Sequence, residues 1–288
     1  MSNSALSYTV ASVSSHDGTI IGYRQLGSGP GVIIWHGGMQ ASQGYMRLAT
    51  ALADTFTVYV PDRRGRGLSG PHGEQYSMAK ECHDVEALLS QSGAQFLFGH
   101  SSGGLVALQA AFTLPAIRKV AVYEPPLSLS SLIFTMPWTA RFEREIARGH
   151  MASALITVGK GLTISRTIAL LPRWLLLPLI TFLLHRDRQT LKPNDVAIEA
   201  LIPTQQFDML LVEEMDGSLD RFAKLESDVL LLGGNKSPAF LRDALDALEK
   251  TLPHVERVDY HSLRHDAPNE TPERLVSDLR TFFGPSIL

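Results

Sequence analysis

The sequence predicts an α/β fold: a mostly parallel sheet with helices on both faces and one inserted α-helical segment. Short apolar runs without polar alternation recur along the chain and are separated by segments with helical spacing, which is typical of strands buried on both faces. This alternation stops between residues 127 and 226, where helical patches but no clear β run occur, and then resumes. We therefore expect a core of residues 1–126 and 227–288, with residues 127–226 inserted as a lid.

The expected elements follow in chain order. Two short strands, Tyr8–Val13 and Thr19–Tyr23, are joined at His16–Gly18, where Asp-Gly is a common hairpin turn. Four further strands are largely apolar: Gly31–Trp35, Phe56–Val60, Gln95–Phe98 and Lys119–Tyr123. Helical character is expected at Met78–Ser90, Phe142–Arg148 and Ala152–Val158. After the insertion, strand and helix alternate over Val229–Leu232, Phe240–Leu248, Val255–Tyr260 and a last helix near Pro272–Phe283.

Length and composition are those of a soluble globular protein. The 288 residues suffice for one large α/β domain with an insertion, and 44% hydrophobic with 19% charged residues is ordinary. Because the net charge is −3 and no basic run occurs, we expect neither nucleic acid nor an anionic membrane as partner. Cys82, the only cysteine, can form no intramolecular disulfide and is expected to be a buried thiol. The N-terminus lacks a basic start before an apolar core, so we expect a cytoplasmic protein.

The stretch Leu162–Leu184 is rich in leucine and isoleucine. A membrane-spanning helix needs about 20 continuous apolar residues. Here Arg166 and Arg173 carry charge, and Pro172 and Pro178 are expected to break the helix. We therefore expect short apolar helices that cover a pocket, with peripheral membrane contact as the less favoured alternative.

The pentapeptide Gly99–Gly103 has the form G-x-S-x-G between an apolar strand and a helix-prone stretch. A serine becomes a nucleophile when its hydroxyl is held exposed, beside a base and beside donors for a developing oxyanion. A sharp turn between strand and helix provides that exposure, and the flanking glycines let the backbone turn tightly. Ser101 is thus the candidate nucleophile.

Four separated motifs, in this order, resemble those of the α/β-hydrolase superfamily. They are His36–Gly38 after an apolar strand, the D-x-R-G-x-G-x-S turn Asp62–Ser69, the pentapeptide Gly99–Gly103 and the loop Leu263–Pro268. The resemblance implies that Ser101 is the nucleophile, that His265 is the general base, and that no cofactor is needed. It also implies an oxyanion hole made by the backbone N–H groups of Gly38 and Ser102, with Met39 as an alternative.

Histidine titrates in the range that a general base needs, and His265 follows the last expected strand. His261 is the rival, four residues earlier, and can equally be a polar residue at a strand end. The spacing of the two histidines imitates a metal-binding pair on a helix. Because this segment reads as a loop, we expect no metal site.

The acidic partner of His265 is less obvious. In the superfamily it often follows the strand that here reads Leu230–Leu232, but Asn235 and Ser237 stand where the aspartate is usual. Some members place it instead at the end of the strand after the nucleophile helix. That strand here ends in Glu124, followed by two prolines, so Glu124 is our candidate. The alternatives are Asp208 and Asp228, whereas Asp266 adjoins His265 too closely to orient it.

Gly65–Gly70 also fits G-x-G-x-x-G, the dinucleotide fingerprint. That function requires a helix to begin within the motif, whereas Pro71 and Gly73 continue a loop. We therefore expect a glycine turn in which Asp62 pairs with an arginine, and no bound nucleotide.

The sequence favours a serine hydrolase that cleaves an ester or lactone of a bulky hydrophobic small molecule. Relatives that remove halides or open epoxides use an aspartate nucleophile, which Ser101 argues against. Met39, Trp138, Phe142 and Trp174 are candidate substrate contacts. The alternatives are a non-catalytic ligand-binding protein on the same fold and an acyl transferase or cyclase, because fold alone does not select between them. The sequence is compatible with a homodimer.

Overall fold

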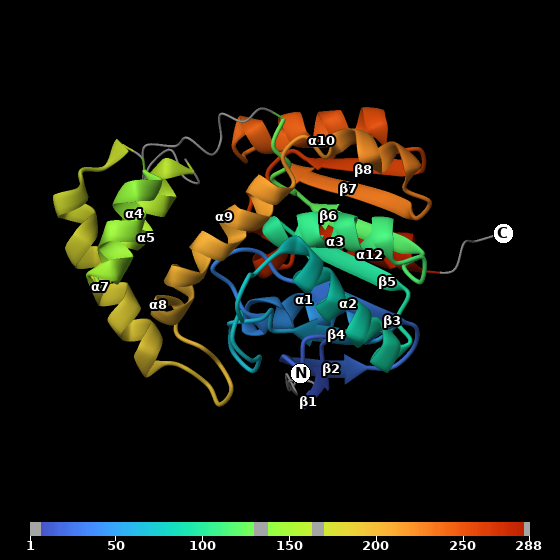
Figure 1. Ribbon diagram of the computed structural model, residues 1–288, viewed down its shortest axis with the longest axis horizontal. Helices are drawn as coiled ribbons and strands as arrows, with labels where there is room; N and C mark the ends of the chain where they lie inside the picture. Colours follow the sequence, from blue (N-terminus) through green and yellow to red (C-terminus); the bar gives the residue numbers. More distant parts are fainter. Residues whose placement is uncertain (1–6, 130–137, 163–169, 285–288) are drawn as a thin grey trace.

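The computed structural model describes residues 7–129, 138–162 and 170–284 (Figure 1). Its centre is one eight-stranded sheet with the order β1-β2-β4-β3-β5-β6-β7-β8. The strands are β1 (Thr9–Ser14), β2 (Ile20–Gly27), β3 (Gly31–Trp35), β4 (Thr57–Pro61), β5 (Phe96–His100), β6 (Lys119–Tyr123), β7 (Asp228–Gly234) and β8 (Val255–Tyr260). Only the pairs β1–β2 and β2–β4 are antiparallel. The predicted fold class, a mostly parallel α/β sheet, is therefore confirmed.

Helices cover both faces of this sheet, because its parallel strands are apolar on both sides. One face packs against α2 (Met78–Ser92), α3 (Ser102–Thr113) and α10 (Ala239–Thr251). The other face packs against α1 (Met46–Leu52) and α12 (Glu273–Phe283). A short helix, α11 (Ala267–Glu270), lies between β8 and α12. Cys82 is buried in the first of these cores, as predicted.

Five α-helices between β6 and β7 lie wholly within the described ranges, and we call the described residues from Trp138 to Lys224 the helical insertion. They are α4 (Thr139–Ala147), α5 (Met151–Gly161), α7 (Arg173–Gln189), α8 (Ile198–Leu201) and α9 (Gln205–Glu214). Figure 1 shows α4, α5 and α7 grouped to one side of the sheet, with α9 between them and the core. Phe142, Ala154, Val158 and Leu184 form a small hydrophobic core within the insertion.

The apolar stretch 162–184 differs from the prediction. Proline at 178 was expected to end a helix, yet α7 runs through it from Arg173 to Gln189. Pro172 precedes the first turn, where a proline without an N–H is readily accommodated. Residues 163–169 lie outside the described part of the chain. Among the helices of the described ranges, none is long and apolar enough to cross a membrane.

The glycines of G-x-S-x-G have a packing role beyond the turn itself. A Cβ on Gly103 would lie 2.3 Å from the carbonyl oxygen of His36, and one on Gly99 would lie 2.5 Å from that of Gly103. Helix α3 thus packs backbone against backbone on β3 and β5, which no larger residue would permit. This contact places the first turn of α3 directly beside the loop that follows β3.

Candidate active site

Ser101 lies at the junction of β5 and α3, with φ 53° and ψ −127°. This conformation is unfavourable for a residue with a Cβ, and its cost must be offset by surrounding contacts. One such contact is a 2.9 Å hydrogen bond from the Ser101 N–H to the carbonyl oxygen of Tyr123 on β6. The backbone is therefore held in the sharp turn predicted for an exposed nucleophile.

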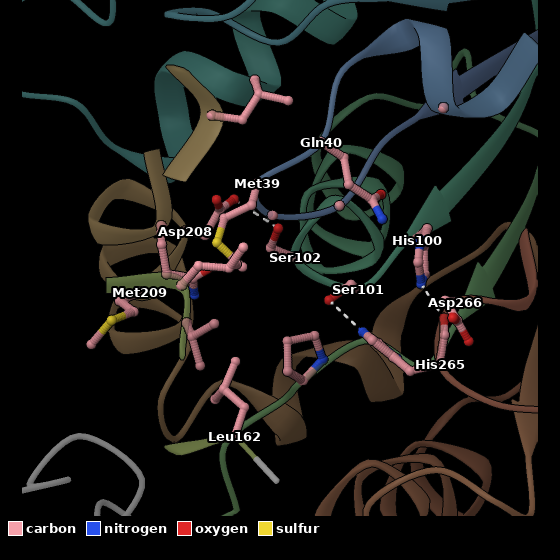
Figure 2. Close-up of a pocket in the computed structure, with 18 of the residues that line it drawn as sticks. Met39, Gln40, His100, Ser101, Ser102, Leu162, Asp208, Met209, His265 and Asp266 are labelled. Atoms are coloured by element: carbon pink, nitrogen blue, oxygen red, sulfur yellow. Dashed lines mark hydrogen bonds between the residues drawn. The ribbon is translucent and has the colours of Figure 1, made fainter. Parts of the chain in front are cut away.

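His265 lies between Ser101 and Glu124. Its Nε2 is 3.0 Å from the Ser101 hydroxyl, and its Nδ1 is 2.7 Å from Oε2 of Glu124 (Figure 2 shows the bond to Ser101). Because a carboxylate only accepts hydrogen bonds, Nδ1 carries the proton and Nε2 is free to accept the serine proton. The three side chains come from the ends of β5, β6 and β8, at the carboxyl edge of the parallel strands.

Glu124 is fully buried directly after β6, with φ 48°. Its second oxygen, Oε1, accepts a 2.7 Å hydrogen bond from the N–H of Gly234 at the end of β7. The backbone N–H of Glu124 donates to the carbonyl oxygen of Leu232, also on β7, at 3.0 Å. The last residue of β7, just before the loop in which the usual aspartate is absent, therefore supplies a backbone donor that orients the carboxylate of Glu124.

The alternative acids and the rival histidine lie elsewhere. Asp228 is exposed at the opposite end of β7, and His261 is exposed in the turn after β8. Asp266 lines the cavity beside His265 but makes no described hydrogen bond to it. Asp208 is buried among arginines and has no described bond to His265. Of the carboxylates considered, the structure brings Glu124 to His265.

The loop His36–Met39 lies against Ser101, as a Cβ on Gly37 would be 3.1 Å from the Cβ of Ser101. Gly38, Met39 and Ser102 line the same cavity as Ser101. The Ser102 N–H is in the first turn of α3, where the helix itself offers no acceptor and the helix dipole favours a negative charge. This arrangement suits the predicted oxyanion hole, whose donors remain a prediction.

A cavity of about 520 Å³ opens above Ser101 and His265. Its opposite wall comes from the helical insertion and is largely apolar, formed by Trp138, Leu155, Leu162, Leu201, Met209 and Val212. Met39 and Trp138 thus line the cavity, where substrate contacts were predicted, and Figure 2 shows Met209 across the cavity from Ser101. Phe142 is instead buried within the insertion, and Trp174 is 76% exposed on its outside. The structure therefore brings neither of these two aromatic residues to the site.

A buried ionic cluster, which the sequence did not reveal, supports the floor of the site. Arg63 donates to both oxygens of Glu81 at 3.0 Å and to Oδ1 of Asp208 at 2.9 Å. Arg66 donates to Oδ2 of Asp208 at 2.7 Å, and the Ser102 hydroxyl donates to Oδ1 at 2.8 Å. Burial alone would raise the pKa of Asp208, but Arg66 and Arg63 outweigh it and lower that pKa to about 2. Asp208 therefore joins α9 of the insertion to the residue after the nucleophile.

Asp62 was predicted to pair with an arginine, but its described partners are backbone N–H groups. Its carboxylate accepts hydrogen bonds from the backbone N–H groups of Ser42 at 2.6 Å and Leu68 at 2.9 Å. It thus closes the glycine turn 65–70, and the next helix, α2, begins only at Met78. The motif therefore lacks the helix that a dinucleotide site needs, in agreement with the sequence argument.

His100 connects the two loops that flank Ser101. Its Nε2 is 2.7 Å from the carbonyl oxygen of His265, and its Nδ1 is 2.5 Å from the hydroxyl of Tyr45. That hydroxyl also accepts the N–H of Gly37 at 3.2 Å. Burial, reinforced by the nearby His265, holds the pKa of His100 well below its ordinary value, so the ring is neutral. A continuous set of hydrogen bonds therefore joins the Gly37 loop to the backbone of His265.

Known proteins share this architecture. A soluble epoxide hydrolase from Corynebacterium sp. (strain C12) is 25% identical over 95% of this chain and 98% of its own length. An alpha/beta hydrolase structure from Sphaerobacter thermophilus has a TM-score of 0.73 at 29% identity, covering 93% of this chain and all of that one. An esterase from Rhodococcus sp. ECU1013 shares the fold at 21% identity, with a TM-score of 0.67 and coverages of 95% and 98%.

The sequence motifs, the sheet order and the position of Ser101 all agree with one family. The model of the alpha/beta hydrolase family matches residues 32–278, which span the site and most of both parts of the core. The chain therefore belongs to the alpha/beta hydrolase family.

Proposed function

We propose that the protein is a serine hydrolase that cleaves the ester or lactone bond of a bulky, apolar small molecule. The observation that carries this proposal is the line of hydrogen bonds from Ser101 through His265 to Glu124 at the base of the cavity. A base that lies 3.0 Å from a nucleophile and 2.7 Å from an orienting carboxylate is the arrangement needed for acyl transfer to serine.

In the proposed mechanism Ser101 Oγ attacks the substrate carbonyl carbon while His265 Nε2 accepts the hydroxyl proton. The buried carboxylate of Glu124 stabilises the imidazolium that forms. The N–H groups of Gly38 and Ser102 stabilise the oxyanion, and His265 then protonates the leaving alcohol. Water, deprotonated by His265, releases the acyl group from Ser101. Each step uses groups of this chain and needs no added cofactor.

An ester suits this site better than an epoxide, although a relative is named a soluble epoxide hydrolase. Attack by a serine alkoxide on an epoxide carbon would form an ether, whose C–O bond water and histidine cannot cleave. Attack on an ester or lactone carbonyl forms an acyl-enzyme, which the same histidine can hydrolyse. Ser101 therefore favours carbonyl substrates.

The cavity indicates the substrate class. Its volume of about 520 Å³ lies within the range of small-molecule sites, and its insertion wall is largely apolar. A small polar ester would leave that wall in contact with water, whereas a long acyl chain or a ring system would cover it. We therefore propose that the apolar part of the substrate contacts Met39, Trp138, Leu155 and Met209.

Hydrolysis of a graded set of substrates tests this proposal: p-nitrophenyl esters with acyl chains of increasing length, an aryl lactone and an aryl epoxide. We expect kcat/KM to increase with acyl length until the cavity is filled, no opening of the epoxide, and no turnover by Ser101→Ala. Ester turnover that persists in Ser101→Ala, or epoxide opening without ester hydrolysis, would overturn the proposal. Tight binding of these compounds without any turnover would instead favour a ligand-binding protein.

A further inference from the structure

Helix α7 exposes an unusual number of large apolar side chains. Trp174 is 76% exposed and Phe182 60%, and four leucines of the same helix are between 43% and 53% exposed: Leu175, Leu177, Leu179 and Leu183. Only Leu176 and Leu184 are buried. A helix that is apolar on all sides is normally covered by protein or lipid, because water contact with such a surface is costly.

Four of these side chains, Trp174, Leu175, Leu179 and Phe182, form one face that points away from the cavity. Leu176, Ile180 and Leu184 follow one another at intervals of four residues on the side that packs into the insertion. Leu175, Leu179 and Phe182, spaced four and three residues apart, therefore lie on the outer side. Figure 1 shows α7 at the edge of the insertion, away from the sheet. We call Trp174, Leu175, Leu179 and Phe182 the outer face of α7.

Basic residues continue this face at the carboxyl end of the helix. Arg186 is four residues after Phe182 and is exposed. Within the described ranges it has no ion pair, whereas Arg188 is paired with Glu199. Residues 170–192 contain four Lys and Arg against one acidic residue, Asp187, in a chain with a net charge of −3. Two of the four basic residues, Arg173 and Arg188, are in ion pairs, whereas Arg186 and Lys192 are exposed at the carboxyl end. An apolar face bordered by excess positive charge is the pattern of a helix that lies in the surface of an anionic membrane.

We propose that the outer face of α7 binds the surface of a membrane that contains anionic lipids. The helix would lie in the headgroup region, with Trp174 and Phe182 inserted among the acyl chains and Arg186 among the phosphates. A second copy of the chain fits this face less well, because each copy would bring the same positive charge to the contact. This inference takes up the less favoured alternative for the stretch Leu162–Leu184, peripheral membrane contact. It departs from the expectation of no membrane partner, which rested on the net charge of the whole chain.

Vesicle sedimentation tests the proposal with the full chain. We expect binding to phosphatidylcholine vesicles with about one third phosphatidylglycerol, and little binding to phosphatidylcholine alone. The double variant Trp174→Ser/Phe182→Ser should bind the mixed vesicles at least about tenfold more weakly. Arg186→Glu should weaken binding about fivefold or more, an effect that high salt reduces.

Matched controls alter similar residues outside the insertion. Val10 and Ile20 are 46% and 47% exposed on the β1–β2 hairpin, so Val10→Ser/Ile20→Ser should bind as the wild type does. Arg47→Glu on α1 is the control for Arg186→Glu, since Arg47 is also exposed. All four variants should retain wild-type hydrolysis of a short soluble ester, which shows that they are folded independently of membrane binding.

Tryptophan fluorescence reports which part of the protein enters the lipid. A blue shift on addition of mixed vesicles should occur in the wild type and be absent in Trp174→Phe, which should still sediment with them. The proposal is overturned if anionic vesicles do not bind the wild type, or if control and α7 variants bind equally. It is also overturned if the wild type is a dimer in solution that Trp174→Ser/Phe182→Ser dissociates, with no vesicle binding by either.

Discussion

At the scale of single residues, Glu124 is the carboxylate that we propose orients His265. Its place at the end of β6 adjoins the end of β7, and the Gly234 N–H there binds the oxygen that His265 does not use. The sequence allowed this prediction because Glu124 ends an apolar strand and precedes two prolines. The supporting N–H could not be predicted, since backbone donors leave no signature in residue identity.

Glu124→Gln should lower kcat for ester hydrolysis by about 10² to 10⁴, with little change in KM. The glutamine amide cannot stabilise an imidazolium, and its NH₂ group can favour the wrong tautomer of His265. Steady-state kinetics on the best ester substrate measure this. Asp228→Asn, which removes an exposed carboxylate from the opposite end of the adjacent β7, is the control and should remain within about twofold of wild type. Equal losses in both variants would contradict the role of Glu124.

Asp208 makes the stability of the protein depend on pH in the acidic range. Its pKa of about 2 in the folded state is below the ordinary 3.8, so its stabilisation is complete above about pH 4 and is lost as the pH falls towards 2. The difference in unfolding free energy between wild type and Asp208→Asn should therefore shrink by about 2 kcal/mol over that interval. Urea unfolding at several pH values measures it. A difference that does not vary with pH would show that Arg63 and Arg66 do not stabilise the charged form.

At the scale of elements, the two loops beside Ser101 are held to each other as well as to the sheet. The bonds from Gly37 through Tyr45 and His100 to His265 cross the carboxyl edge of β5. We therefore expect His100 to be a positioning residue, because it contacts the backbone of the proposed base rather than the reacting atoms. Its role was missed by the sequence argument, which treated it only as the variable residue of G-x-S-x-G.

His100→Ala should reduce kcat at least about tenfold while KM changes less, because His265 loses the bond that holds its backbone. His100→Gln, whose amide can still donate to the His265 carbonyl oxygen, should recover part of that loss. Kinetics and thermal unfolding of both variants separate positioning from simple destabilisation. The exposed His261, in the same loop after β8, provides the control: His261→Ala should be as active as wild type. Full activity of His100→Ala would refute the positioning role.

The elements themselves were largely predictable, since the strands combine apolar runs with turn residues at their ends. Pro178 led to a wrong prediction, because the expectation that proline ends a helix considers the local backbone alone. Helix α7 continues through Pro178 and is also stabilised by the burial of Leu176 and Leu184. Trp174 and Phe142 were misassigned for a related reason. Aromatic residues in an apolar helix can face a cavity, a core or the outside, and only the docking of the helices decides which.

At the scale of the whole molecule, the core and the helical insertion meet at the site. Asp208 of α9 reaches Arg63, Arg66 and Ser102, more than 100 residues earlier in the chain. Such contacts depend on how the insertion is placed, which no local pattern encodes. The proximity of Ser101, Glu124 and His265 was predictable, because all three follow parallel strands and the carboxyl ends of such strands lie along one edge of the sheet. Which residues of the insertion line the opposite wall of the cavity was not predictable.

The central claim is that the fold activates Ser101 as a nucleophile. Intact-mass measurement after treatment with a fluorophosphonate tests it most directly, because this reagent bonds covalently to an activated serine. We predict one adduct per chain in the wild type, none in Ser101→Ala and slower labelling of Glu124→Gln. A folded wild-type protein that takes up no label, or a Ser101→Ala variant labelled to the same extent, would contradict the account.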